Sequence, residues 1–293
     1  MKKLVINKND LLNNLNIIKA KIGNDTKIIG VVKANGMGLD LIKYSEFLIE
    51  NGIEILAVAT VEEAISLRQA GINKDILMLS EVVLEEELEL LIKNDIILTI
   101  GSLEEKDVIE RLSKELEKQV KAHIKVDTGF ARYGFLYTET DKILEAVKSN
   151  NNLQITGMYT HFSKAINEKW TRIQFKRFEN CMKIVKDSFL KNDSIDEKFI
   201  FHCSSSTAAL KYPEMKLDAV RLGSVIQGRV LKEFSNLGLR EIGHLETEIV
   251  KIKQLPKGYN VSYSNEFKTK KETKIAIIPV RIYGWFKCKK SKR

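Results

Sequence analysis

Eight short apolar segments, separated by amphipathic stretches, constrain the fold of this chain more than any other feature. Each is apolar at nearly every position, which is typical of a strand buried on both faces. The segments are residues 27–34, 54–60, 75–80, 96–101, 120–129, 155–161, 199–205 and 219–228. Such strands alternating with helices predict an α/β fold, a (β/α)8 TIM-type barrel. A doubly wound open sheet is the alternative, because periodicity cannot show closure.

Helical spacing and capping signals occur between these segments. Amphipathic stretches at residues 9–22, 61–71, 84–94 and 105–118 predict helices. A Ser or Thr followed three residues later by an acidic residue forms a capping box, which marks a helix start. Pairs with this spacing are Thr60 with Glu63, Ser102 with Glu105, and Thr138 with Asp141. We expect a helix to begin at each of them.

The pattern changes beyond Leu231. Strand-like segments at 244–255, 260–267 and 273–286 follow one another without helices, and Pro256-Lys257-Gly258 supplies a turn signal between the first two. We therefore expect a barrel over residues 1–232 and the start of a truncated, mostly β domain over residues 233–293.

Composition limits the binding partners and the cellular compartment that we expect for this chain. The chain has 48 Lys+Arg against 39 Asp+Glu, giving +9, but the charges are interspersed, so we expect no nucleic acid as the main partner. We expect no membrane span, because no apolar run approaches roughly 18 residues. Three cysteines without metal-ligand spacing favour a reducing cytoplasm and no metal site.

Polar residues follow most of the apolar segments, where a barrel carries its active site. They are Lys33, Lys125, Asp127, Arg132, His161, Ser204, Ser205, Ser206, Arg221 and Gly223. Lys33 is the sharpest signal, because a lysine after five apolar residues is costly to bury charged. It either reaches the barrel mouth as a snorkelling side chain or forms a Schiff base with an aldehyde cofactor.

Several segments together resemble the alanine racemases, pyridoxal 5'-phosphate (PLP) enzymes with an N-terminal barrel and a C-terminal β domain. The matching segments are VVKANGMG (31–38), KVDTGFARYGF (125–135), THFS (160–163), HCSSSTAAL (202–210), VRLGSVIQG (220–228), LPKGYNVSYSNEF (255–267) and IAIIPV (275–280). They occur in family order and cover nearly the whole chain. The resemblance implies a cytoplasmic, homodimeric isomerase that interconverts L- and D-alanine, a small-molecule substrate, for peptidoglycan precursors.

The resemblance also implies catalytic roles for individual residues. Lys33 would hold PLP as a Schiff base and then move the Cα proton on one face. Arg221 would face the pyridine nitrogen, Arg132 the cofactor's phenolic oxygen and the substrate carboxylate, and His161 would hold the second base. Lys125 matches a lysine that the family carbamylates to orient that arginine. Lys125 could instead be a plain barrel lysine paired with Asp127.

The phosphate contacts implied by the resemblance come from two segments, Ser205-Ser206 and Gly223-Ser224. The chain departs from the family here, since Met37 replaces a tyrosine that contacts the phosphate and Gln227 replaces another near the last strand. Alternatives that these departures leave open are a racemase for another small amino acid, such as serine, and a non-catalytic PLP-binding barrel. His161 and His202 could also be satisfied core histidines.

The largest departure follows Pro279-Val280, where the family has a Gly-Tyr-x-Asp-Gly motif. Tyr283 lies close to the motif's tyrosine position, but its neighbours do not match. We therefore expect this chain to lack the second catalytic base, a tyrosine contributed across the dimer, and to be inactive or nearly so. Dropping one base from an allowed coding of residues 281–286 yields Gly-Tyr-Met-Asp-Gly, so we expect a truncation or frameshift near the C-terminus.

Overall fold

The computed structural model describes residues 2–191 and 199–279. The chain divides into Asn9–Glu241 and a second unit made of Met1–Lys8 with Ile242–Arg293, and we describe each by itself. The first unit thus runs beyond the expected boundary at residue 232. Asn14 explains the extension, because its side chain accepts from Arg240 N at 2.8 Å and donates to Arg240 O at 2.8 Å. Tyr283 and the expected frame change lie outside the described residues.

The first unit is built on eight parallel strands in the described part of the chain. These are β2 (Lys27–Val31), β3 (Ile55–Val58), β4 (Asp75–Met78), β5 (Leu98–Ile100), β6 (Val120–Asp127), β8 (Leu153–Tyr159), β9 (Ile200–Ser205) and β10 (Ala219–Leu222). Seven of them lie within expected segments, and β8 begins two residues before its expected segment, 155–161. A two-residue strand, β7 (Phe135–Leu136), adds to the end of β6.

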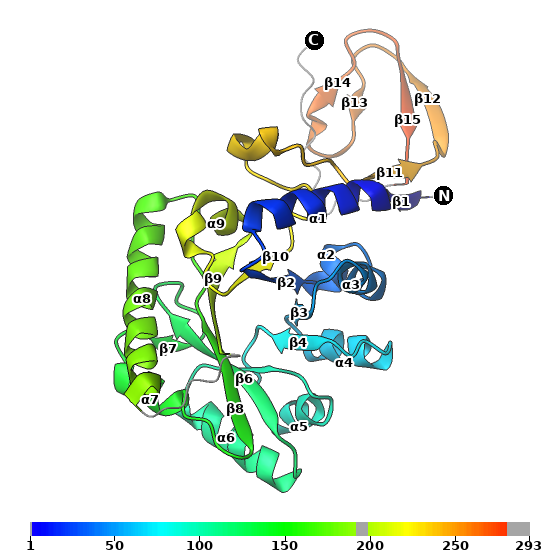
Figure 1. Ribbon diagram of the computed structural model, residues 1–293. Helices are drawn as coiled ribbons and strands as arrows, with labels where there is room; N and C mark the ends of the chain where they lie inside the picture. Colours follow the sequence, from blue (N-terminus) through cyan, green and yellow to red (C-terminus); the bar gives the residue numbers. More distant parts are fainter. Residues whose placement is uncertain (1, 192–198, 280–293) are drawn as a thin grey trace. The chain divides into compact units, whose positions relative to one another are not determined.

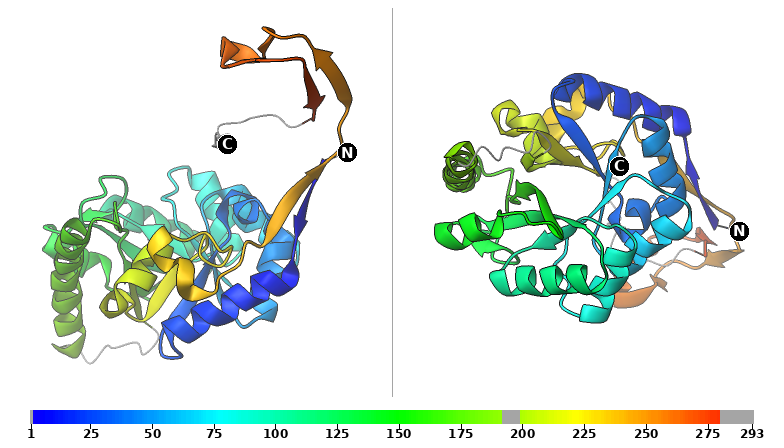
Figure 2. Two further views of the ribbon diagram at one scale, coloured as in Figure 1. Left: turned by 90° about the horizontal axis from the view of Figure 1, so that it is seen from above. Right: turned by 60° about the horizontal axis from the view of Figure 1, so that its bottom comes forward.

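The strand order shows that the sheet is a barrel rather than an open sheet. Neighbours run β4-β3-β2-β10-β9-β8-β6-β5, and a parallel bridge between Leu77 and Ile97 joins the two ends of this order. Backbone bonds from Met78 N to Ile97 O and from Ile97 N to Ile76 O, both 2.9 Å, complete that junction. The (β/α)8 expectation is confirmed, and helices surround the strands (Figures 1 and 2).

Helices lie at all four predicted amphipathic stretches, and further helical segments and turns lie between the other strands. The described elements are α1 (Lys8–Ile22), α2 (Lys33–Met37), α3 (Leu41–Glu50), α4 (Val61–Gln69), α5 (Glu85–Lys93), α6 (Leu103–Glu115), α7 (Thr140–Ala146), α8 (Glu168–Lys191), α9 (Ser206–Lys211), and the 3-10 turns η1 (Pro213–Met215) and η2 (Lys232–Leu237). None of the described helices is both long and apolar enough to cross a membrane.

Two of the three predicted capping boxes are confirmed. Thr60 and Ser102 cap α4 and α6 by accepting from Glu63 N at 3.3 Å and Glu105 N at 3.1 Å. The prediction at Thr138 is wrong, because the chain is still turning there and Glu139 precedes the first helical residue. The Glu139 carboxylate accepts from Leu136 N at 2.8 Å, so it holds the turn after β7 instead.

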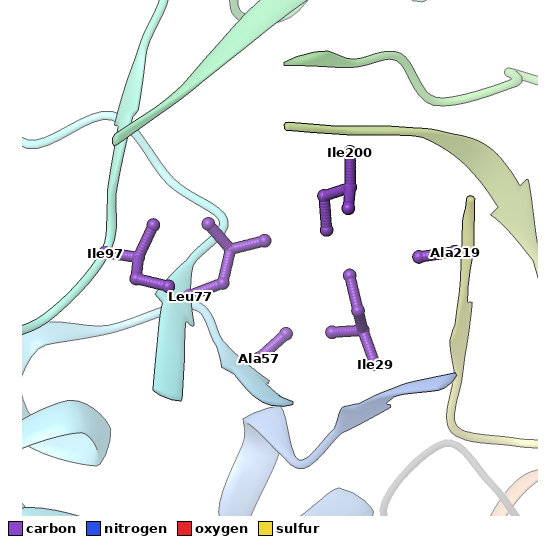
Figure 3. Packing of buried hydrophobic residues seen from close by; sticks show 6 residues of the cluster. All are labelled: Ile29, Ala57, Leu77, Ile97, Ile200 and Ala219. Carbon is purple, nitrogen blue, oxygen red and sulfur yellow. The ribbon is translucent and has the colours of Figure 1, made fainter. Parts of the chain in front are cut away.

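The barrel interior is filled by side chains from different strands. Its central cluster is Ile29, Ala57, Leu77, Ile97, Ile200 and Ala219, whose side chains point toward one another in Figure 3. They are at most 7% exposed. Buried polar side chains, Thr99, His123 and His202, lie within β5, β6 and β9, nearer than this cluster to the carboxyl ends where a barrel presents a site.

Gly157 in β8 provides a test of this packing. A Cβ added there would lie 2.8 Å from Ile200 O and 2.9 Å from the His123 ring, and neither can move away cheaply. We expect Gly157→Ala to lower the free energy of unfolding by about 2 kcal/mol, measured by urea denaturation. Gly71→Asn is the control: nothing lies within 4 Å of an added Cβ, and Asn tolerates its φ of +84°. Equal losses for both variants would contradict the packing argument.

The second unit consists of short antiparallel pairs. They are β1 (Lys2–Ile6) with β11 (Gly243–Thr247), β12 (Lys251–Leu255) with β15 (Thr273–Ile277), and β13 (Asn260–Val261) with β14 (Phe267–Lys268). The segment expected as one strand over 244–255 is two strands, because its halves pair with different partners. The segment 260–267 is likewise interrupted by a turn, η3 (Tyr263–Asn265).

Candidate active site

A cavity of about 340 Å³ opens at the carboxyl ends of the barrel strands, where the expected site residues converge. All nine residues to which the sequence analysis gave site roles line it: Lys33, Lys125, Arg132, His161, Ser205, Ser206, Arg221, Gly223 and Ser224. They come together because parallel strands end on the same side of a barrel. The cavity is also lined by residues to which no role was predicted: Ala59, Leu79, Ser80, Tyr133 and Tyr159.

Lys33 follows β2 and begins a left-handed turn. Ala34, Asn35 and Gly36 have φ values of 56°, 54° and 64°. The turn is closed by hydrogen bonds from Gly36 N to Val32 O at 2.8 Å and from Gly38 N to Ala34 O at 3.0 Å. Left-handed backbone costs L-residues roughly 1–2 kcal/mol each, so the surrounding structure must hold it. Such strain is found where a functional side chain is positioned.

Arg221 in β10 is the most completely bonded cation of the cavity. It is 4% exposed. One guanidinium nitrogen donates to His202 Nδ1 at 2.7 Å, and the other donates to Thr160 O at 2.8 Å and His161 Nδ1 at 3.1 Å. Because arginine only donates, both histidine Nδ1 atoms must accept. His202 then donates through Nε2 to His123 Nδ1 at 2.9 Å, which fixes the protonated nitrogen of each ring.

These histidines are held neutral. Burial, followed by the charge of Arg221, lowers the pKa of His123 to about 3. The same two causes lower the pKa of His161 to about 3, and Lys125, Arg132 and Lys33 add to the effect. His202 is fully buried, and its pKa is lowered for the same reasons. His161 therefore presents a neutral ring at the cavity edge, and His202 is a satisfied core histidine.

Lys125 lies deep in the cavity. Its side chain is buried, with Nζ 4.6 Å from the centre of the Tyr159 ring. Burial, with the charges of Arg221 and Arg132, lowers the Lys125 pKa to about 7. The expected alternative partner, Asp127, directs its Oδ1 to Gly129 N at 2.7 Å and Phe130 N at 2.8 Å. Asp127 thus shapes the loop that carries Arg132, whose guanidinium lies 4.5 Å from the Phe130 ring centre.

Hydrogen-bond donors gather where β9 and β10 end. Ser206 Oγ accepts from Gly223 N at 3.3 Å and Val225 N at 3.5 Å, which are long bonds that an incoming anion could replace. A Cβ at Gly223 would lie 2.4 Å from Met37 Sδ, so a larger residue here would require the Met37 side chain to move. The serine hydroxyls and backbone N–H groups form a cluster of hydrogen-bond donors, a kind of group suited to an anion.

Two titratable side chains near the cavity, Tyr159 and Glu81, were not predicted as site residues. Tyr159 stacks on His202 with ring centres 4.8 Å apart, and burial raises its pKa to about 12. Its place directly before Thr160-His161 at a strand end could have revealed it. Glu81 lies beyond β4 near Lys125; burial and the neighbouring Glu105 raise its pKa to about 7. No local motif marks Glu81, since its partners Glu105 and Lys125 come from distant parts of the chain, α6 and β6.

No group of three metal-ligating side chains lies together within residues 2–191 and 199–279. The fold and cavity define a barrel protein whose strand ends carry two lysines, two arginines, a neutral histidine and a cluster of hydrogen-bond donors.

Comparison with known proteins identifies the family to which the chain belongs. The model of the alanine racemase N-terminal domain matches residues 6–229, and that of the C-terminal domain matches residues 242–281. The chain belongs to the alanine racemase family.

Individual relatives agree with this assignment. An alanine racemase of Methanococcus maripaludis is 35% identical over 92% of this chain and 72% of the relative. An alanine racemase of Halothermothrix orenii is 36% identical over 91% of this chain and 70% of the relative. The solved structure of an alanine racemase of Clostridium difficile has a TM-score of 0.83 at 32% identity, covering 95% of this chain and 73% of that one.

Proposed function

We propose that this protein is a PLP-dependent isomerase that interconverts L- and D-alanine. The observation that carries the proposal is the convergence of the nine expected site residues on one cavity in a chain of the alanine racemase family. Family membership favours alanine over the alternatives of serine racemisation and a non-catalytic barrel. Supply of D-alanine for peptidoglycan precursors, in the cytoplasm, is the role we infer for it.

The cavity residues fit the parts of PLP. Ser205, Ser206 and the N–H groups of Gly223 and Ser224 suit its phosphate, because all four residues line the cavity and the Gly223 N–H makes only a long bond, 3.3 Å, to Ser206 Oγ. The Lys33 amine would bind the cofactor covalently, and Arg221 would meet the ring nitrogen. Bound PLP supplies an electron-accepting ring that stabilises the charge left on the substrate when its Cα proton is removed.

Arg221 would limit what the site can do. Its guanidinium stays charged and donates all its hydrogen bonds, so it disfavours a second positive charge beside it. When the ring nitrogen carries no positive charge, less of the negative charge at the substrate Cα moves into the ring. This favours return of the proton to Cα. Lys33 would move the Cα proton on one face. Arg132, at the exposed edge of the cavity, would bind the substrate carboxylate.

The opposite face of the substrate needs a second acid–base group. We propose Tyr263, a residue of the described chain that the sequence analysis did not assign. Its side chain is 94% exposed, on a turn in which Ser262, Ser264 and Asn265 have φ values of 65°, 59° and 51°. Such strain is retained where it presents a functional group. The matching C-terminal family model includes this turn.

A homodimer would complete the site. A phenol on the second unit can serve the barrel cavity of another subunit, as the family resemblance implies, with His161 at the cavity edge to orient it. This arrangement supplies the second base that the sequence analysis expected to be missing.

Lys125 is proposed to be carbamylated. Only a neutral amine attacks CO₂, releasing one proton and forming an anionic carbamate that Arg132 can contact. Because burial and the arginines lower the Lys125 pKa to about 7, the amine becomes neutral as pH rises through 7. We expect the carbamate signal in ¹³C-bicarbonate NMR to increase from pH 6 to pH 8 and to be absent in Lys125→Met. A signal that persists in Lys125→Met would contradict the assignment.

The function is tested by incubating the purified, PLP-loaded protein with L-alanine and measuring D-alanine with a D-amino-acid oxidase. We expect D-alanine to accumulate until the two enantiomers are equal. Cofactor binding without any D-alanine, but with exchange of the Cα proton for deuterium on one face, would refute the role of Tyr263. No exchange on either face would refute the racemase proposal.

A further inference from the structure

Glu63 links the segments that follow two neighbouring strands, β2 and β3. It belongs to the capping box that starts α4, with its backbone N donating to Thr60 Oγ1 at 3.3 Å. Its two carboxylate oxygens accept from two different elements. Oε2 accepts from Ala59 N, after β3, at 3.1 Å, and Oε1 accepts from Asn35 N at 3.2 Å. A capping box satisfies donors at its own helix start, so the bond to Asn35 is additional.

The additional bond reaches the left-handed turn that follows Lys33. Asn35 has a φ of 54°, and the turn's own hydrogen bonds use the N–H groups of Gly36 and Gly38. The N–H of Asn35 donates to Glu63 instead. The Asn35 side chain stabilises the exit of the turn, because its Oδ1 accepts from Leu41 N at 3.0 Å. Glu63 thus bonds the middle of a strained segment from outside.

The capping box of α6 provides a comparison within the same barrel. Glu105 Oε2 accepts from Gly101 N at 2.7 Å, as Glu63 Oε2 does from Ala59 N. The Glu105 side chain otherwise interacts with the Glu81 carboxyl group, not with a backbone N–H of a neighbouring loop. The bond to a neighbouring strand's turn distinguishes Glu63 from Glu105.

We propose that Glu63 is a positioning residue for Lys33. It does not line the cavity, and it acts by fixing the turn that directs the Lys33 side chain into it. β2 and β3 are neighbouring strands, paired through Val31 and Ala57. The last backbone hydrogen bond between them runs from Val32 N to Ala57 O at 2.9 Å. Beyond that bond, the Glu63 carboxylate connects the two segments that follow the strands. The inference rests on the proposed function, which assigns the covalent role to Lys33.

The first test uses cofactor-free protein, so it is independent of activity. Glu63→Gln keeps the size of the side chain but leaves one acceptor oxygen for two donors. We expect hydrogen exchange of the peptide covering residues 33–38 to accelerate about tenfold, as loss of one charge-assisted bond predicts. Glu62→Gln removes the same charge from the same helix turn without touching Asn35, and we expect no acceleration. Equal exchange rates in the two variants would overturn the proposal.

The second test follows the consequence for Lys33. We expect Glu63→Gln to weaken PLP binding about tenfold in a spectrophotometric titration and to lower the yield of borohydride-fixed cofactor at Lys33. Glu62→Gln should match the unsubstituted protein in both. Normal PLP uptake and fixation by Glu63→Gln would overturn this inference alone. An unsubstituted protein that takes up no PLP would instead refute the proposed function, while the exchange experiment still decides whether Glu63 holds the turn.

Discussion

Lys33→Ala is expected to lower kcat for alanine racemisation at least about 10³-fold, within the range that loss of a positioned acid–base group produces. The lysine is assigned two tasks, covalent attachment of the cofactor and proton transfer at Cα, and alanine performs neither. The variant should fold, because the Lys33 side chain is exposed at the cavity and its turn is held by backbone bonds. Initial rates with saturating PLP provide the measurement.

Lys43→Ala is the control for that variant, since it removes an exposed lysine from the helix that follows the turn. Its kcat should equal that of the unsubstituted protein. Loss of a positioned acid–base group lowers the rate by more than about tenfold. If Lys33→Ala retained more than about a tenth of the activity, another amine would be the one that binds PLP and moves the Cα proton.

Tyr263→Phe is expected to lower the rate of racemisation about 10²- to 10⁴-fold while leaving the affinity for PLP unchanged. The substitution removes only a hydroxyl group from a side chain that is 94% exposed, so the fold has little to lose. Proton exchange at Cα in deuterated water should persist for one alanine enantiomer, because Lys33 still serves its face. Comparing exchange of the two enantiomers by NMR separates the loss of one base from general inactivation.

Tyr259→Phe is matched to it, because Tyr259 lies in the same unit and is 53% exposed. We expect this control to racemise alanine normally. Equal rates for Tyr263→Phe and Tyr259→Phe would show that Tyr263 is not the second base. Inactivity of the unsubstituted protein as well would support the expectation that the chain lacks a second base.

The barrel could be predicted because its signals are local. A doubly covered strand is apolar along its length, so each of the eight segments contained a strand. Thr60 and Ser102 were correct caps, since their partners lie three residues away. The prediction at Thr138 was wrong because a turn after β7, held by Glu139, delays the start of the helix. The spacing of residues in the sequence does not reveal that turn.

The second unit was harder to predict, because its strands are short and their partners are distant in sequence. One apolar segment divides into β11 and β12 only because β1 and β15 pair with different halves. An isolated segment carries no information about such partners, so pattern alone joined the halves into one strand.

The positions of the site residues followed from the barrel, but their interactions did not. Strand ends marked Lys33 and Arg221 correctly as cavity residues. The neutral state of His161 depends on burial and on charges from three other strand ends. The bond of Glu63 to Asn35 depends on the pairing of β2 with β3. These are tertiary effects, which local sequence does not encode.

The central claim is that Lys33 binds PLP in the barrel cavity. Reduction of the PLP-treated protein with borohydride, followed by proteolysis and peptide mass analysis, tests it most directly. We expect a single adduct, carried by the peptide that contains Lys33, and no labelling of Lys125. A protein that remains unlabelled, or an adduct found on another lysine, would contradict the claim.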